Sequence, residues 1–159
     1  MSPLFTPTTA GALALPNRIA MAPLTRARAG RAHVPNALMA EYYAQRASAG
    51  LLIAEATMVS SEASAFTGEP GIFDEACVTG WKAVTDAVHA KGGRIVLQLW
   101  HPGRAAHSLL DGGRQPVSST DRAIQGDTIH TPEGPKPYEA PRRLEVSELP
   151  GIVDLFVEG

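Results

Sequence analysis

The sequence predicts an α/β fold built on a parallel sheet. Short apolar segments rich in β-branched residues alternate with segments of helical periodicity. The order strand, helix, strand, helix, strand repeats at roughly 30 to 45 residues, which is typical of right-handed βαβ units with their helices outside the sheet. Each element is expected in the order that follows.

The first strand is expected at residues 18–25, where Ile19 and Met21 stand among small residues before a turn at Pro23. A helix should follow and stop at Gly50. It is indicated by apolar residues at helical spacing: Leu38, Met39, Tyr42, Tyr43 and Ala47. The second strand is expected at residues 51–59, a nearly continuous apolar run with one Glu, as in a strand covered on both faces.

The second helix and third strand are expected on either side of Gly92–Gly93. Trp81, Val84 and Val88 recur at i, i+3 and i+7 before these glycines. Residues 94–101 after them are apolar and β-branched, interrupted only by Gln98.

A long irregular segment is expected at about residues 102–145. Residues 102–142 hold six Pro and five Gly in 41 positions without a sustained period. A segment of this length inside a compact domain is either functional or wrongly assigned, and we favour a functional loop. A third helix should then begin, with Ser147 as N-cap, Pro150 in the first turn and an apolar face formed by Ile152, Val153 and Phe156.

The three units correspond to the first part of a (β/α)8 barrel, which needs about 250 residues. The 159 residues end at Gly159, within the apolar pattern of the third helix. Three parallel strands cannot close a barrel, and their two unpaired edges favour association. We therefore expect a second polypeptide to complete the sheet, or an engineered or proteolytic origin for the chain.

Composition excludes several function classes. Fourteen Lys and Arg against 16 Asp and Glu, without runs of one sign, predict no partner among nucleic acids or anionic membranes. No apolar run approaches the roughly 20 residues of a membrane span, and we expect a cytoplasmic location. Cys77 stands alone and is expected to be a small semi-buried side chain. Five scattered His lack ligand spacing, so no metal site is expected.

The unusual polar residues fall at the carboxyl ends of the three expected strands, where barrels of this type carry their chemistry. Thr25 supplies a hydroxyl, Gln98 an amide, and Ala56 a small side chain that lets the backbone approach a flat ring. Together they suit a planar heterocycle with a donor and acceptor edge, such as a flavin. These ends also carry Pro23, Leu24 and Trp100.

Structural alternatives exist for most of these residues. Thr25 is equally suited to cap the turn after Pro23, and Trp100 and Phe66 fit ordinary core positions. His101, followed by Pro-Gly, fits a turn. Gln98 is harder to explain structurally, because an amide buried in an apolar strand needs partners.

Five segments along the chain stand out in order: NRIAMAPLTRARA, MAEYYAQRASAGLLIAEATMVS, GEPGIF, GGRIVLQLWHPGRAAH and LPGIVDLF. Together they resemble the old yellow enzyme family along essentially the whole chain, which would cover the first half of that family's sequence. The resemblance implies an eight-stranded (β/α)8 barrel that holds FMN, takes hydride from NADPH or NADH, and delivers it to an activated alkene.

The resemblance implies a role for each residue at the strand ends. Thr25 matches the hydroxyl that binds the flavin C4 carbonyl oxygen, Gln98 the amide at the pyrimidine edge, and Ala56 the small residue packed by the flavin. Pro23 and Leu24 match the segment lying against the ring. Trp100 and Phe66 match the substrate pocket, where many relatives carry Tyr in place of Phe66.

The family's catalytic groups have no match in this chain. The His with His or Asn three residues on, the Tyr proton donor and the later Arg residues are expected on the second polypeptide, and Tyr138 is not assigned to the donor role. We expect the isolated chain to be inactive. The alternatives are a non-catalytic half-barrel that self-associates, and half of a related dienoyl reductase or amine dehydrogenase.

Overall fold

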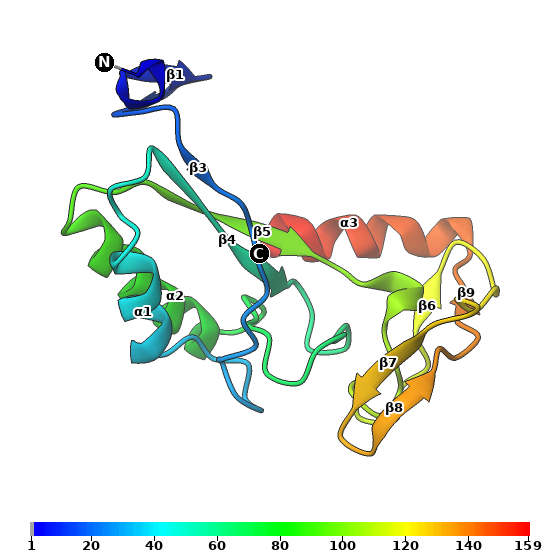
Figure 1. Ribbon diagram of the computed structural model, residues 1–159. Coiled ribbons are helices and arrows are strands. Elements are labelled where there is room, and N and C mark those ends of the chain that lie inside the picture. Colours follow the sequence, from blue (N-terminus) through cyan, green and yellow to red (C-terminus); the bar gives the residue numbers. More distant parts are fainter. Residues whose placement is uncertain (1) are drawn as a thin grey trace.

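The computed structural model describes residues 2–159, and its centre is a parallel sheet of three strands in the order β3-β4-β5 (Figure 1). The strands are β3 (Ala20–Met21), β4 (Leu51–Met58) and β5 (Ile95–Trp100). This confirms the expected α/β arrangement. β3 is shorter than the expected 18–25, because only Ala20 and Met21 pair with β4, opposite Leu51 and Leu52.

Two helices, α1 (Ala37–Ala44) and α2 (Glu75–His89), lie together on one side of this sheet. Asn36 caps α1 by accepting from Met39 N, and Asp74 caps α2 by accepting from Cys77 N. α2 therefore begins six residues before Trp81, and α1 ends before Ala47 in a series of turns. The core between helices and sheet contains Met39, Tyr43, Ala47, Leu52, Ala54, Trp81, Val84 and Val88.

The opposite face of the sheet is open over β5. Ile95 and Leu97 pack against the core, while Val96 and Gln98, which alternate with them, are exposed. Gln98 is thus not the buried amide that the apolar strand suggested, because nothing in residues 2–159 covers its face.

β4 contains a bulge that changes which residues face the helices. Ile53 is opposite Val96 and Ala56 is opposite Gln98, so β4 uses three residues where β5 uses two. Ala54 lies in the core, and Glu55 also turns to the helix side, where it contacts Tyr43. Ala56 consequently shares the open face with Gln98.

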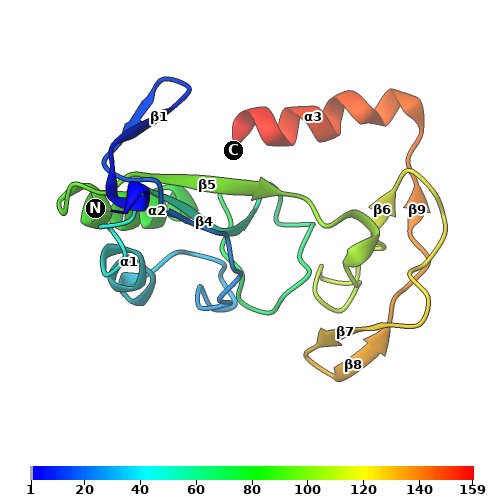
Figure 2. The same ribbon diagram turned by 45° about the horizontal axis from the view of Figure 1, so that its top comes forward.

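The expected irregular loop at 102–145 contains regular elements. β6 (Val117–Ser118) pairs in parallel with β9 (Arg142–Arg143), and β7 (Thr128–Thr131) forms an antiparallel hairpin with β8 (Gly134–Pro137). A short 3-10 helix, η2 (Gly103–Ala105), precedes them. The β7–β8 hairpin lies at the far end of the molecule from the N-terminal hairpin of β1 (Thr8–Ala10) and β2 (Leu13–Leu15) (Figure 2).

The third helix, α3 (Leu149–Glu158), carries Pro150 in its first turn, as expected. It directly follows the short 3-10 helix η3 (Val146–Glu148). Another short 3-10 helix, η1 (Pro3–Phe5), lies at the start of the chain. Ser147 is not the N-cap of α3, because Ser147 lies inside η3, and the residue that precedes α3, Glu148, makes no side-chain cap bond to it. The Glu148 carboxylate instead caps η3 by accepting from Glu145 N at 2.8 Å, and it also binds Arg142.

Candidate functional site

The carboxyl ends of β3, β4 and β5 meet at one edge of the sheet and bring together the residues at the strand ends. Ala56 and Gln98 are direct cross-strand partners. The segment after β3 is fixed beside them, because Arg26 N donates to Glu55 Oε2 at 2.8 Å. Ala56 and Gln98 therefore lie side by side, and Thr25 belongs to the neighbouring segment that Arg26 ties to β4.

The polar groups at this edge are free to bind a ligand. Across residues 2–159, neither the Thr25 hydroxyl nor the Gln98 amide has a hydrogen-bond partner, so Thr25 does not cap the turn after Pro23. Pro23 and Thr25 are half-buried and Leu24 is exposed, whereas Ala56 is buried. The edge thus offers a hydroxyl and an amide beside a small residue, the combination a flat polar ring requires.

Glu55 holds this edge in place through a buried network that the sequence did not reveal. The Tyr43 hydroxyl donates to Glu55 Oε1 at 3.0 Å and accepts from Glu55 N at 2.9 Å. Burial raises the pKa of Tyr43, so the hydroxyl remains a donor. The only feature of the sequence that points to this network is the single Glu in the apolar run of β4.

Phe66 and Trp100 form an aromatic pair next to this edge rather than part of the core. Their rings are stacked, with centroids 6.0 Å apart and planes at 20°. Phe66 is 45% exposed, and Trp100 Nε1 is buried without a partner among the described residues. The core interpretation of these two aromatics is therefore wrong.

A cavity of about 160 Å³ adjoins this pair, and we call it the Phe66–Trp100 pocket. The hairpin β7–β8 and the residues after it supply much of its wall, so the long segment after β5 contributes to the site. Tyr138 lies here too, which its place in the sequence did not indicate. The lining residues are Ala65, Phe66, Trp100, Ala105, Thr128, Ile129, His130 and Tyr138.

The loop after β4 is held by two buried carboxyl groups. Ser64 N donates to Asp111 Oδ1 at 2.6 Å, and Ser64 Oγ donates to Glu69 Oε1 at 2.8 Å. Burial raises the pKa of both acids, that of Asp111 to about 7. Neither acid stood out in the sequence, because the two are 42 positions apart and carry no motif.

Other candidate chemistry is structural. His101 Nδ1 accepts from Gly103 N at 3.0 Å, which supports its turn role, and burial lowers its pKa. Cys77 is fully buried rather than semi-buried, and burial raises its pKa to about 12. Over the described part of the chain, no three His, Cys, Asp or Glu side chains are grouped to hold a metal. No helix there has the length and apolarity to cross a membrane.

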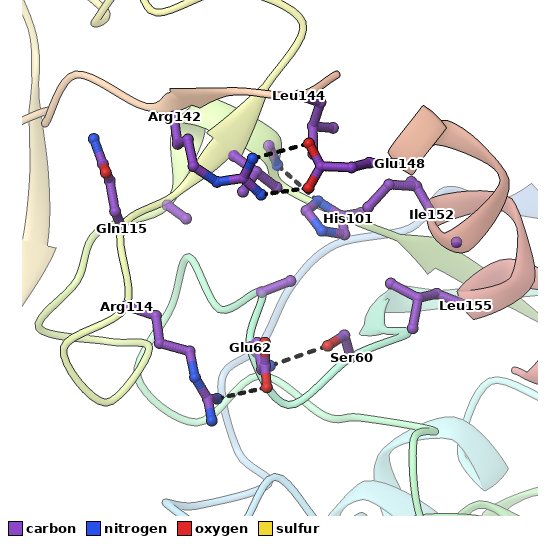
Figure 3. Close-up of a pocket in the computed structure, with 15 residues that line it drawn as sticks. Ser60, Glu62, His101, Arg114, Gln115, Arg142, Leu144, Glu148, Ile152 and Leu155 are labelled. Atoms are coloured by element: carbon purple, nitrogen blue, oxygen red, sulfur yellow. Dashed lines mark hydrogen bonds and ion pairs between the residues drawn. The ribbon is translucent and has the colours of Figure 1, made fainter. Parts of the chain in front are cut away.

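A second cavity, of about 410 Å³, opens between α3 and the loops after β4 and β5 (Figure 3). Two ion pairs stand at its wall: Arg142 with Glu148 at 2.8 Å and Arg114 with Glu62 at 2.9 Å. It includes His101, directly after β5, but none of Thr25, Ala56 and Gln98 and neither ring of the aromatic pair. This cavity is therefore separate from the candidate site.

Comparison with known proteins identifies the family. Residues 3–159 match the NADH:flavin oxidoreductase / NADH oxidase family. The chain belongs to this family. Among solved structures it is similar to the old yellow enzyme homologue from Zymomonas mobilis, with a TM-score of 0.94 and 48% identity over 99% of this chain and 44% of that one. Morphinone reductase in complex with tetrahydroNAD gives a TM-score of 0.92 and 47% identity over 99% and 45%.

Curated relatives agree with this assignment. Flavin oxidoreductase hxnT of Emericella nidulans is 44% identical over 96% of this chain and 40% of its own length. The 12-oxophytodienoate reductase 7 of Oryza sativa subsp. japonica is 45% identical over 98% and 40%. The chain thus spans about two fifths of the curated old yellow enzyme relatives it matches and shares the fold of that part of their barrel.

Proposed function

We propose that the protein is part of an FMN-dependent ene-reductase, which transfers hydride from NADPH or NADH through FMN to the C=C bond of an activated alkene. The observation that carries this proposal is the pairing of Ala56 with Gln98 beside the segment of Thr25 at the carboxyl edge of the sheet. Membership of the flavin oxidoreductase family supports it.

The residues at this edge fit a flavin. Ala56 leaves space for a planar ring on the open face, and Gln98 on the same face offers both a donor and an acceptor to the pyrimidine edge. The Thr25 hydroxyl would donate to the C4 carbonyl oxygen, and Pro23 and Leu24 would lie against the ring. When bound, FMN supplies the hydride acceptor and donor, and a bond from Thr25 favours its electron-rich reduced form.

The Phe66–Trp100 pocket would receive the alkene. Its aromatic walls suit an apolar substrate body. Several similar proteins are named for a substrate with a ketone or an aldehyde, as in 12-oxophytodienoate reductase, morphinone reductase and chanoclavine-I aldehyde reductase. We therefore propose enones, enals and maleimides as the substrate class, and prefer ene-reduction to the chemistry of a dienoyl reductase.

The partner we propose is a second polypeptide that carries the remaining five βα units. The free edges of β3 and β5, and the exposed Val96 and Gln98 on the open face, are where these units would pack. The groups that polarise the substrate carbonyl and protonate it would come from this partner, so we expect no activity from the isolated chain.

The test is to purify the protein with any polypeptide that accompanies it and to record its native mass and visible spectrum. A yellow complex with one FMN per chain, bleached by NADPH or NADH and restored by 2-cyclohexenone, would support the proposal. A Gln98→Ala variant should then bind FMN several-fold more weakly, with Gln115→Ala as the amide control outside this edge. A colourless homo-oligomer that takes up no added FMN would instead favour the self-associating module.

A further inference from the structure

The carboxylate of Glu69 organises the turn that carries Phe66. Its Oε1 accepts from Ser64 Oγ at 2.8 Å, Ala65 N at 2.7 Å and Phe66 N at 3.2 Å. These donors belong to three consecutive residues that end at Phe66. Glu69 is fully buried, so water does not compete for these bonds.

Glu69 is itself fixed to both neighbouring strand ends. Its carbonyl oxygen lies 2.6 Å from His33 Nδ1, in the loop after β3. The next residue binds β4, because Met58 N donates to Pro70 O at 2.9 Å. The carboxylate is thus a fixed point relative to the sheet, and the turn before it takes its position from that point.

We propose that Glu69 is a positioning residue that holds the ring of Phe66 against Trp100 and thereby sets the shape of the substrate pocket. That this cavity binds substrate rests on the proposed function, whereas the link from Glu69 to Phe66 and Trp100 rests on the structure alone. Because Phe66 is 45% exposed, neighbouring side chains do little to fix its ring, and its backbone must do so.

A carboxylate suits this task better than a neutral acceptor. One oxygen receives three donors, and bonds to a charged acceptor are stronger than bonds to an amide. A Gln side chain in this position would keep only one acceptor oxygen and would replace the other with an NH2 group. That NH2 group would either face the three donors or take the buried place of Oε2, which has no partner among residues 2–159. Glu69→Gln should therefore loosen the turn while preserving its shape and volume.

The experiment compares Glu69→Gln, Phe66→Ala and the double variant in the complete flavin-loaded protein. We expect Glu69→Gln to raise KM for a bulky cyclic enone about 3- to 10-fold with kcat within about twofold, since binding rather than chemistry changes. In the Phe66→Ala background the same substitution should have almost no further effect, because Glu69 acts through that ring. Glu62→Gln is the matched control, since Glu62 lies in the same loop after β4 as Glu69 but is exposed and bonded to Arg114.

A second readout does not depend on activity. In ¹⁵N-tryptophan-labelled protein the indole signal of Trp100 should move in Glu69→Gln, because the stacked Phe66 ring shifts it, while that of Trp81, bonded to Gly71 O, should not. Ser64→Ala removes one donor and keeps the Glu69 carboxylate, so it should move the Trp100 signal less and in the same direction. This variant replaces Glu69→Gln in the test if Glu69→Gln does not fold.

The outcomes separate the two proposals. An unmoved Trp100 signal in the folded variants, or additive effects of Glu69→Gln and Phe66→Ala, would overturn the role of Glu69 even in an active ene-reductase. A moved signal in a protein that neither binds FMN nor reduces enones would leave the positioning role intact and reject the proposed function.

Discussion

Residues 37–100 and residues 101–148 are held in place by different interactions. In the first region, β4 and β5 form a backbone ladder, and α1 and α2 cover one face of the sheet with a packed apolar core. In the second, the strands have two to four residues, and buried or half-buried carboxyl groups take up backbone N–H groups, as Glu139 does for Ser108 N at 2.7 Å. The comparison teaches that the scaffold depends on apolar burial, whereas the loops of the site depend on hydrogen bonds to carboxyl groups.

The largest expected effect comes from the scaffold. Leu52→Ala, at a fully buried position, should lower the free energy of unfolding by about 2–5 kcal/mol, because it leaves a cavity in the core. Val96→Ala on the open face of β5 should cost less than about 1 kcal/mol. Urea unfolding of both variants measures these losses of unfolding free energy. Equal losses would show that the core face of the sheet contributes no more to stability than its open face.

The second effect is a pH dependence in the loops. Burial raises the pKa of Asp111 in the folded protein to about 7, against 3.8 for the free side chain; Glu69 and Glu139 add to this rise, and the bond from Ser64 N and the charge of Arg114 oppose it. The folded state therefore keeps a proton that the unfolded chain has lost, so the stabilisation is full below about pH 3.8 and is lost as the pH rises towards 7.

Asp111→Asn should flatten this dependence. Between pH 4 and 8 we expect the wild type to lose about 2–4 kcal/mol more than the variant, as read from urea midpoints. Parallel curves for the two proteins would show that Asp111 titrates normally.

The third effect comes from a buried polar contact inside the scaffold, between α1 and β4. Tyr43→Phe removes a hydroxyl that both donates to Glu55 and accepts from its backbone, and leaves a buried carboxylate oxygen without that donor. A loss of about 1–3 kcal/mol is expected. Tyr42→Phe, on the same helix but only half-buried, is the control and should change the unfolding midpoint little.

The smallest effect belongs to an exposed ion pair. Asp86→Asn breaks the contact of Asp86 with Lys82 at 3.2 Å on the surface of α2 and should cost less than about 0.5 kcal/mol, vanishing in high salt. A loss comparable with that of Tyr43→Phe would contradict the expectation that exposed ion pairs contribute much less than buried polar contacts in this molecule.

The sequence predicts the scaffold well and the loops poorly. Periodicity identifies α1, α2, β4 and β5 because apolar burial imposes it, and the placement of Ala56 and Gln98 at one edge follows from parallel strands. Their contact with flavin stays a prediction.

The missed features arise from side-chain and backbone contacts that leave no periodic pattern in the sequence. The capping of η3 by Glu148 through Arg142, the hairpin of β7 and β8, and the joint hold of Glu69 and Asp111 on Ser64 depend on contacts with no period or motif. The exposure of Gln98 depends on what covers the sheet, which the local pattern does not contain.

The bulge in β4 also separates charge from the proposed redox centre. Strand side chains alternate, so the same residues in a regular strand would place Glu55, rather than Ala56, opposite Gln98 on the open face. In the present strand the bulge keeps Glu55 on the side of Tyr43 and leaves the methyl group of Ala56 beside Gln98. In a regular strand a carboxylate would stand where the flavin is proposed to accept electrons, and its negative field would oppose reduction. The bulge therefore keeps a negative charge away from the proposed flavin site.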